Sequence, residues 1–339
     1  MTSFSRSIVV VALALSSFAA RAAEPEVTIK LATIAPEGSP WASALVDFKA
    51  KAEAAMGGKL RVKLFLGGTL GDENDSMMAV KRGQVQAFAG STGALASQVP
   101  EFNVLELPYL FDRLEEADYV LSKLILSDIE KACTDRGLTF GFWSENGYRS
   151  FGGKFKVTKP EDLKGRKMRS QENPIHLTMY RTFGASPVPI PTTEALTALQ
   201  TGAVDGYDQS ALYLFAASWH TASKFYSVTN HIYQPAAIVY NKTAWDAWPA
   251  EVRKALKDAG NAVEADLRKT VRAMNPILLK NVEELGVQVN VLTDAELAPF
   301  KKLAEKSRAE SIKSASKPEK AVYAKITKGL ADFRSGKVK

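Results

Sequence analysis

The sequence predicts an α/β fold of two domains, with a ligand cleft between the domains, hinge strands and long C-terminal helices. The chain has 339 residues, which is more than one ordinary hydrophobic core holds. Strand-like and helix-like segments alternate, as they do in mostly parallel sheets. The chain is expected to cross twice between the domains, so strands rather than a flexible linker form the hinge. The expected boundaries are 24–146 plus 235–274 for the first domain, and 147–234 plus 275–335, with the C-terminal helices, for the second.

Residues 1–22 have the features of a secretory signal peptide. Arg6 supplies the positive charge, an apolar stretch runs from Ile8 to Ala20, and Ala20-Arg21-Ala22 is an A-x-A cleavage site. The apolar stretch is shorter than the roughly 20 residues that a membrane-spanning helix needs. We therefore expect export, with cleavage near Ala22/Ala23. No cysteine stands at this site, which argues against a lipoprotein.

Local signals support each element of the first domain. Ser39 followed by Pro40 marks a helix start, because a serine side chain caps a helix and proline suits its first turn. Asp72 gives a second capping signal, and Gly83 ends the helix that follows. In chain order we expect a strand at 27–33, a helix from Pro40 to Met56, a strand at 60–66, a helix at 73–82 and a strand at 86–90.

The remaining elements follow the same reasoning. Pro276 predicts a kink in a long helical segment, and Asp294 is expected to cap the C-terminal helices. In chain order we expect a helix at 115–135, a strand from 138 towards 155, a strand at 167–170, a helix at 174–183, a small βαβ unit at 184–209, an extended run at 225–240, helices over 243–286 and a strand at 287–292.

The charge is concentrated near the C-terminus. The chain contains 44 Lys and Arg against 37 Asp and Glu, a net charge of +7, while residues 301–339 hold twelve basic and four acidic residues. Nucleic-acid binding would need basic residues spread over a groove with interleaved aromatic residues. We interpret the segment as docked helices with a solvated Lys-rich face, and contact with a membrane protein or acidic lipid is the less favoured reading. The single cysteine, Cys133, is expected to be buried and unreactive.

No catalytic set or metal site is evident. His176, His220 and His231 are too scattered for metal-ligand spacing. Ser91 lies in a sequence that lacks the first glycine of a nucleophile elbow, and it has no clear basic partner. We therefore expect a binding protein that needs no metal or cofactor, rather than an enzyme.

A group of loop and strand-end residues has the chemistry to hold an anion. Arg169 lies in a short strand beside glycine-bearing turns, and its planar guanidinium suits a carboxylate. Arg149, on a crossing strand, is expected to add a second charge. Gln209 offers an amide, and Ser91 and Thr92 are expected to face the site from the other domain. Together these residues predict a receptor for a small organic anion.

Six motifs, in order across nearly the whole mature chain, resemble those of the periplasmic solute receptors of TRAP transporters, the DctP-type family. They are residues 35–41 (APEGSPW), 67–72 (GGTLGD), 106–111 (ELPYLF), 145–149 (ENGYR), 160–169 (PEDLKGRKMR) and 194–206 (EALTALQTGAVDG). The resemblance implies a two-domain periplasmic binding protein that closes around an organic acid and delivers it to a membrane permease. A monomer that binds no nucleic acid is expected.

By this resemblance Arg169 matches the arginine that pairs with the ligand carboxylate, and Arg149 matches a second arginine. Two positions depart from the family pattern, which often has an aromatic residue in place of Thr192 and an asparagine in place of Gln209. Thr192 is equally open to interpretation as a helix N-cap. The candidate ligand contacts are Arg169, Arg149, Gln209, Ser91, Thr92, Thr192, Trp41, Tyr207 and Glu73.

Two other functions remain open at this point. A receptor of an ABC transporter would have the same architecture but a different permease. A secreted hydrolase or lyase would use Ser91 or a carboxylate, and the lack of a basic partner argues against it. The sequence leaves the identity of the acid open.

Overall fold

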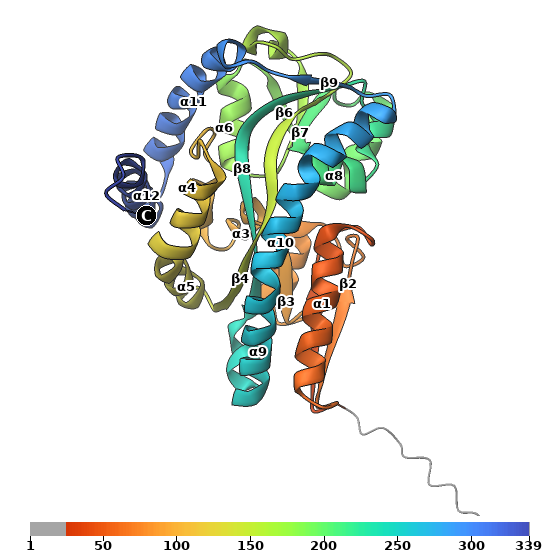
Figure 1. Cartoon of the computed structure of the whole chain (residues 1–339), viewed down its shortest axis with the longest axis vertical. Helices are drawn as coiled ribbons and strands as arrows, with labels where there is room; N and C mark the ends of the chain where they lie inside the picture. Colours follow the sequence, from red (N-terminus) through yellow and green to blue (C-terminus); the bar gives the residue numbers. More distant parts are fainter. Residues whose placement is uncertain (1–24, 339) are drawn as a thin grey trace, which may run out of the picture.

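The computed structural model describes residues 25–338 as an α/β protein built on one mixed sheet (Figure 1). The predicted signal peptide lies outside the described residues. The strand order is β2-β1-β3-β8-β4-β7-β5-β6, with β9 paired to β8. The strands are β1 (Val27–Ala32), β2 (Leu60–Phe65), β3 (Ala87–Ser91), β4 (Leu138–Gly153), β5 (Lys167–Ser170), β6 (Ser186–Pro189), β7 (Gly206–Ser210), β8 (Phe225–Asn241) and β9 (Gln288–Val291).

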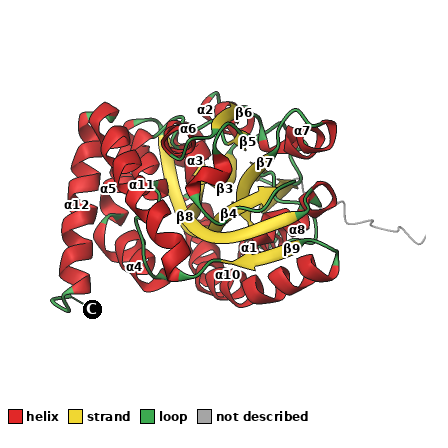
Figure 2. Ribbon diagram, turned by 90° about the horizontal axis from the view of Figure 1, so that it is seen from above, coloured by secondary structure: helices red, strands yellow, loops and turns green. Residues whose placement is uncertain are grey.

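Helices cover both faces of this sheet (Figure 2). The helices are α1 (Pro40–Ala55), α2 (Glu73–Lys81), α3 (Thr92–Leu95), α4 (Leu114–Tyr119), α5 (Leu126–Asp135), α6 (Pro174–Thr182), α7 (Ala195–Thr201), α8 (Ala211–Ala216), α9 (Lys242–Ala247), α10 (Ala250–Glu284), α11 (Asp294–Ser314) and α12 (Lys317–Arg334). The expected helix at 115–135 is two helices joined by a π-turn at 120–124.

Two long antiparallel strands, β4 and β8, pair with each other. On one side of them β1 pairs in parallel with β2 and β3, and β3 pairs with β8. We call this part lobe I. On the other side β5 pairs in parallel with β6 and β7, β7 pairs with β4, and β9 pairs with β8. We call this part lobe II. Strands rather than a loose linker therefore join the lobes.

The N-caps of α1 and α2 are the residues predicted from the sequence. Ser39 accepts a hydrogen bond from the backbone N–H of Ala42, and Asp72 forms a capping box with Asp75. Helix α10 continues for 35 residues through Pro276 and lies along both lobes (Figure 1). Cys133 is buried, as expected.

The C-terminal helices differ from the sequence expectation in two respects. Thr293, not Asp294, caps α11, through a capping box with Glu296. Helix α11 packs on α6 of lobe II, but α12 packs against lobe I. The apolar stripe of α12 joins the core of lobe I, and its residues are Val322, Ile326 and Leu330. The expected assignment of all of residues 275–335 to the second domain is therefore wrong for α12.

Candidate functional site

A cavity of about 30 Å³ lies between the lobes and against the hinge strands. Direct hydrogen bonds cross beside this cavity, such as that from Nε2 of Gln171 to Oε2 of Glu73 at 3.1 Å, so the two lobes are in contact around it. Lobe I, the hinge strands and lobe II all contribute side chains. The lining residues are Thr33, Ile34, Ala35, Pro36, Ser39, Trp41, Glu73, Ala89, Gly90, Asn146, Arg149, Gln171, Thr192, Gln209, Leu212, Tyr213 and Gln234.

Arg169 lies on β5 with only 1% of its surface exposed. Its Nε donates to the carbonyl oxygen of Ile190 at 2.9 Å, and Nη2 donates to Oγ1 of Thr192 at 2.8 Å. The buried Nη1 has no hydrogen-bond partner. Burial, followed by the nearby charge of Arg149, lowers the pKa of Arg169. The guanidinium nevertheless stays charged, so Arg169 is a buried cation with a free donor.

Arg169 does not itself line the main cavity. Thr192, its hydrogen-bond partner, lines the cavity, whereas Arg169 borders a smaller adjoining space of about 10 Å³. Glu73 and Gln171 line both spaces. A ligand group that reached Nη1 would therefore extend from the main cavity past these two side chains.

Arg149 lies on β4 and is equally buried, but all of its nitrogens have partners. Its Nε donates to Oδ2 of Asp208 at 2.6 Å, and Nη2 donates to the Asp208 carbonyl oxygen at 2.6 Å. Nη1 donates to the side-chain oxygens of Gln209 and Gln234, at 3.1 and 3.0 Å. Burial opposes the charge of Arg149, but Asp208 raises the pKa of its guanidinium. The protein itself thus neutralises Arg149.

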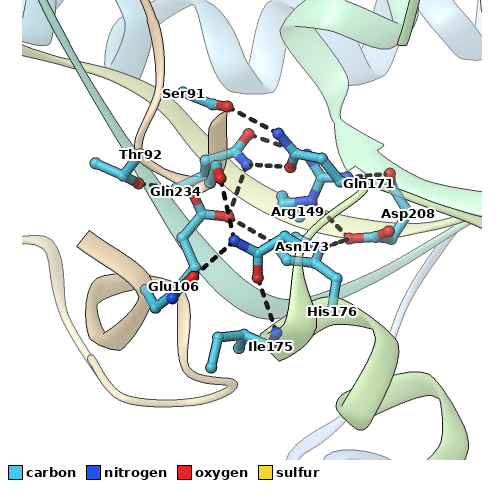
Figure 3. A network of polar contacts seen from close by, with 12 residues as sticks. Ser91, Thr92, Glu106, Arg149, Gln171, Asn173, Ile175, His176, Asp208 and Gln234 are labelled. Carbon is cyan, nitrogen blue, oxygen red and sulfur yellow. Dashed lines mark hydrogen bonds and ion pairs between the residues drawn. The ribbon is translucent and has the colours of Figure 1, made fainter. Parts of the chain in front are cut away.

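A buried network of charged groups surrounds Asp208, the ion-pair partner of Arg149 (Figure 3). His176 lies 2.6 Å from Oε2 of Glu106 and 3.7 Å from Oδ2 of Asp208. Burial alone would lower the pKa of His176, but these two carboxylates raise it. Burial likewise opposes the charge of Asp208, yet Arg149 and His176 hold its pKa well below the usual range. For His231, burial prevails and lowers the pKa.

Two glutamines missed by the sequence analysis connect Arg149 to lobe I. Gln234 accepts from Arg149 and donates from Nε2 to Oε1 of Gln171 at 3.0 Å. Gln171 in turn donates to Oγ of Ser91 at 2.8 Å and to Oε2 of Glu73 at 3.1 Å. Arg149 and Glu106 orient the amide of Gln234, whereas Gln234 and Glu73 orient the amide of Gln171. No spacing in the sequence links these positions, since they meet only when the hinge strands pair.

Glu73, the first residue of α2, is a buried carboxylate that lines the cavity. Its Oε1 accepts from the backbone N–H of Ser91 at 2.7 Å, and its Oε2 accepts from the Ser91 hydroxyl at 2.8 Å. Burial, with the nearby charge of Asp72, raises its pKa to about 7. Gly90 is required beside it, because a Cβ there would lie 2.7 Å from Oε1 of Glu73 and would also overlap Phe88.

The other expected contacts differ in whether they line the cavity. Trp41, Thr192 and Gln209 line the cavity. Ser91 and Thr92 do not line it, but their hydroxyls hold Glu73 and Glu106, the latter at 2.6 Å. Thr192 is the first residue of a 3-10 helix at 192–194 that has Pro191 at its N-cap, so the N-cap interpretation of Thr192 is wrong.

Tyr207 lies away from the cavity. Its ring is fully buried in the core of lobe II, 4.9 Å from the ring of Trp219, and its hydroxyl lies 2.8 Å from Oγ of Ser223. The sequence analysis named Tyr207 as a candidate ligand contact, but its ring packs in this core instead. Tyr207 and Gln209 share a face of β7, and Tyr207, which pairs with Gly152, lies farther from the strand end at which Gln209 lines the cavity.

Within residues 25–338, no group of three or more His, Cys, Asp or Glu side chains could hold a metal ion. No helix of this part of the chain is long and apolar enough to cross a membrane.

The family model of bacterial extracellular solute-binding proteins, family 7, also called DctP, matches residues 31–314. The chain belongs to this family. Its solved relatives are periplasmic receptors rather than enzymes, which confirms both the predicted resemblance and the two-domain α/β fold.

Three members of the family illustrate the similarity. A solute-binding protein of Verminephrobacter eiseniae is 31% identical over 86% of this chain and 90% of its own length. The 2,3-diketo-L-gulonate-binding periplasmic protein YiaO of Escherichia coli is 29% identical over 72% of this chain and 74% of its own. A TRAP periplasmic solute-binding protein from Citrobacter koseri with bound D-glucuronate, 28% identical, has a TM-score of 0.81 over 87% of this chain and 98% of its own.

Proposed function

We propose that this protein is the extracytoplasmic receptor of a TRAP transporter, that it binds a small organic acid through Arg169, and that it delivers the acid to a membrane permease. The free Nη1 of the buried Arg169 is the observation that carries this proposal. An unpaired buried charge is costly, and an acid carboxylate would supply both the counter-charge and the missing acceptor. Arg149 is neutralised by Asp208, and its nitrogens are all hydrogen-bonded within the protein, so its role would be to orient Gln209 at the cavity wall.

The relatives favour acids of this kind. The names of the Escherichia coli and Citrobacter koseri proteins refer to sugar acids, 2,3-diketo-L-gulonate and D-glucuronate. Both proteins align with most of this chain. The cavity of this chain combines hydrogen-bonding side chains with the rings of Trp41 and Tyr213, a combination suited to a hydroxylated acid.

Replacing Arg169 with alanine tests the proposal. Removing one partner of a buried, hydrogen-bonded charge pair costs about 2–5 kcal/mol, so we expect Arg169→Ala to weaken binding about 30-fold or more. Arg166→Ala is the matched control, because Arg166 is exposed and stacks on the ring of Phe155. Titration calorimetry with sugar acids that bind the wild type measures both variants. Near-normal affinity of Arg169→Ala would refute the role of Arg169.

We also propose that the protein reaches the periplasm by cleavage of its N-terminal segment near Ala22/Ala23. The A-x-A sequence and the known location of the family support this step. The mass of the protein isolated from the periplasm tests it, and an uncleaved N-terminus would contradict it.

A further inference from the structure

The charges around the cavity leave room for only one ligand carboxylate. Of the two buried guanidinium groups, Arg149 is paired with Asp208 at 2.6 Å, and Arg169 alone keeps an unpartnered nitrogen. Under the proposed function, on which this inference rests, the acid places its carboxylate against Arg169. A second carboxylate on the same acid would find no further cation with a free donor among the described cavity-lining residues.

Glu73 makes the remaining surface unfavourable for a second carboxylate. It lines both the main cavity and the space beside Arg169. All of its hydrogen-bond donors, from Ser91 and Gln171, are neutral groups. Within the described chain it forms no ion pair.

Two cations share a lining with Glu73: Arg149, which is paired with Asp208, and Arg169, which borders the smaller space and is taken by the ligand carboxylate under the proposed function. The other charged and titratable groups that face Glu73 do not offset its charge. Asp72 precedes it on α2, and Glu106 approaches from the 3-10 helix at 100–106; both raise the pKa of Glu73. Tyr213 of α8 lies on the same cavity wall, and burial raises its pKa, with the charge of Glu73 contributing. Glu172 adds a negative group at the exposed edge of the smaller space.

We propose that Glu73 is a specificity-determining residue that makes this cleft select acids with one carboxylate over acids with two. Like charges brought together in a closed site cost several kcal/mol. The distal end of a monocarboxylic acid carries a hydroxyl that donates to the Glu73 carboxylate. The second carboxylate of a diacid has no proton to donate, and in the main cavity it is repelled by Glu73.

This selection depends on pH in a defined direction. Because the pKa of Glu73 is raised to about 7, the residue is ionised above that pH and neutral below it. A protonated Glu73 no longer repels a second carboxylate and has an O–H to donate to it. The preference for monocarboxylic acids is therefore strong in mildly alkaline solution and declines as the pH falls through about 7.

The test uses two pairs of acids that share a carbon skeleton: D-gluconate with D-glucarate, and 4-hydroxybutanoate with succinate. Titration calorimetry is performed on the mature protein at about pH 8.5 and at about pH 5.5. At the lower pH D-glucarate keeps both charges, whereas succinate is roughly half protonated at its second carboxyl, so the pair of D-gluconate and D-glucarate decides the low-pH comparison. For the wild type we expect the monocarboxylic acid of a pair to bind at least about tenfold more tightly at the higher pH. We expect this ratio to approach one at the lower pH.

Two variants distinguish the effect of the Glu73 charge from the effect of removing one negative charge anywhere on the protein. Glu73→Gln keeps the shape of the side chain, and we expect it to lose the preference at both pH values. Glu251→Gln removes the same charge from an exposed position at the start of α10, outside the cavity lining, so it should keep the wild-type preference. Scanning calorimetry checks that both variants are folded.

The inference is overturned if a wild-type protein that binds the monocarboxylic acid binds its diacid as tightly at about pH 8.5. It is also overturned if folded Glu73→Gln keeps the preference. Failure of all four acids, and of a wider panel of organic acids, to bind the wild type would instead contradict the proposed function itself.

Discussion

Arg149 and Arg169 are both 1% exposed, yet their surroundings differ. Asp208 and two glutamine side chains occupy every nitrogen of Arg149, whereas Arg169 hydrogen-bonds only to Ile190 and Thr192 among the described residues, and its guanidinium lies over the ring of Trp219. The first arginine is therefore part of the scaffold of the site, and the second has a nitrogen available to a ligand. The sequence predicted both arginines as site residues but not this difference, because Asp208 and Gln234 reach Arg149 from distant segments.

The pair of Arg149 and Asp208 is expected to be important for stability. Asp208→Asn would leave the buried guanidinium of Arg149 without its counter-charge. Breaking a buried pair in this way costs about 3–5 kcal/mol, measured as the free energy of unfolding in urea near pH 7. Asp246→Asn is the control, since it breaks an exposed helix pair with Lys242 that is worth at most about 0.5 kcal/mol.

The pH dependence of this difference follows from the pKa of Asp208, which is held well below its usual range. A group with a lowered pKa stabilises the fold above its unfolded pKa, about 4 for aspartate, and this contribution is lost as the pH falls further. The gap between wild type and Asp208→Asn should therefore narrow only in acid. Equal stability of the two proteins at pH 7 would contradict the assigned role.

At the scale of elements, most strands and helices follow from local sequence signals. Alternating apolar residues, serine and aspartate caps and glycine stops placed the strands of lobe I and the helices between them within a few residues. The lobe against which α12 packs could not be predicted in this way. Its stripe of Val322, Ile326 and Leu330 indicates that the helix docks, but not against which lobe. Two ion pairs join it to α5 and α4, namely Lys325 with Asp128 and Arg334 with Glu116.

The identity of the residue that caps α11 can be tested by substitution. Thr293 and Asp294 are both good capping residues, so the sequence did not distinguish them, but the hydroxyl of Thr293 makes the capping box with Glu296. We expect Thr293→Ala to lower the free energy of unfolding by about 1 kcal/mol. Thr293→Ser keeps the hydroxyl and should retain the wild-type value. A larger loss from Asp294→Ala than from Thr293→Ala would show that the cap is misassigned.

At the scale of the whole molecule, the hinge strands bring the site together. Lobe I supplies Glu73 and Trp41, the hinge supplies Arg149 and Gln234, and lobe II supplies Thr192. Direct bonds already cross between the lobes, such as the backbone N–H of Thr193 to Oδ1 of Asp72 at 3.2 Å. Closure of the lobes is therefore the state in which a ligand can touch all of these residues, and a ligand favours this state only through contacts made in it.

The most direct test of the central claim is a crystal structure of the mature protein with the organic acid that raises its melting temperature most. We predict closed lobes, with a carboxylate oxygen of the acid about 2.7–3.0 Å from Nη1 of Arg169 and the rest of the acid in the cavity between the lobes. A carboxylate held by any other cation, with Nη1 of Arg169 still unpartnered, would contradict the account.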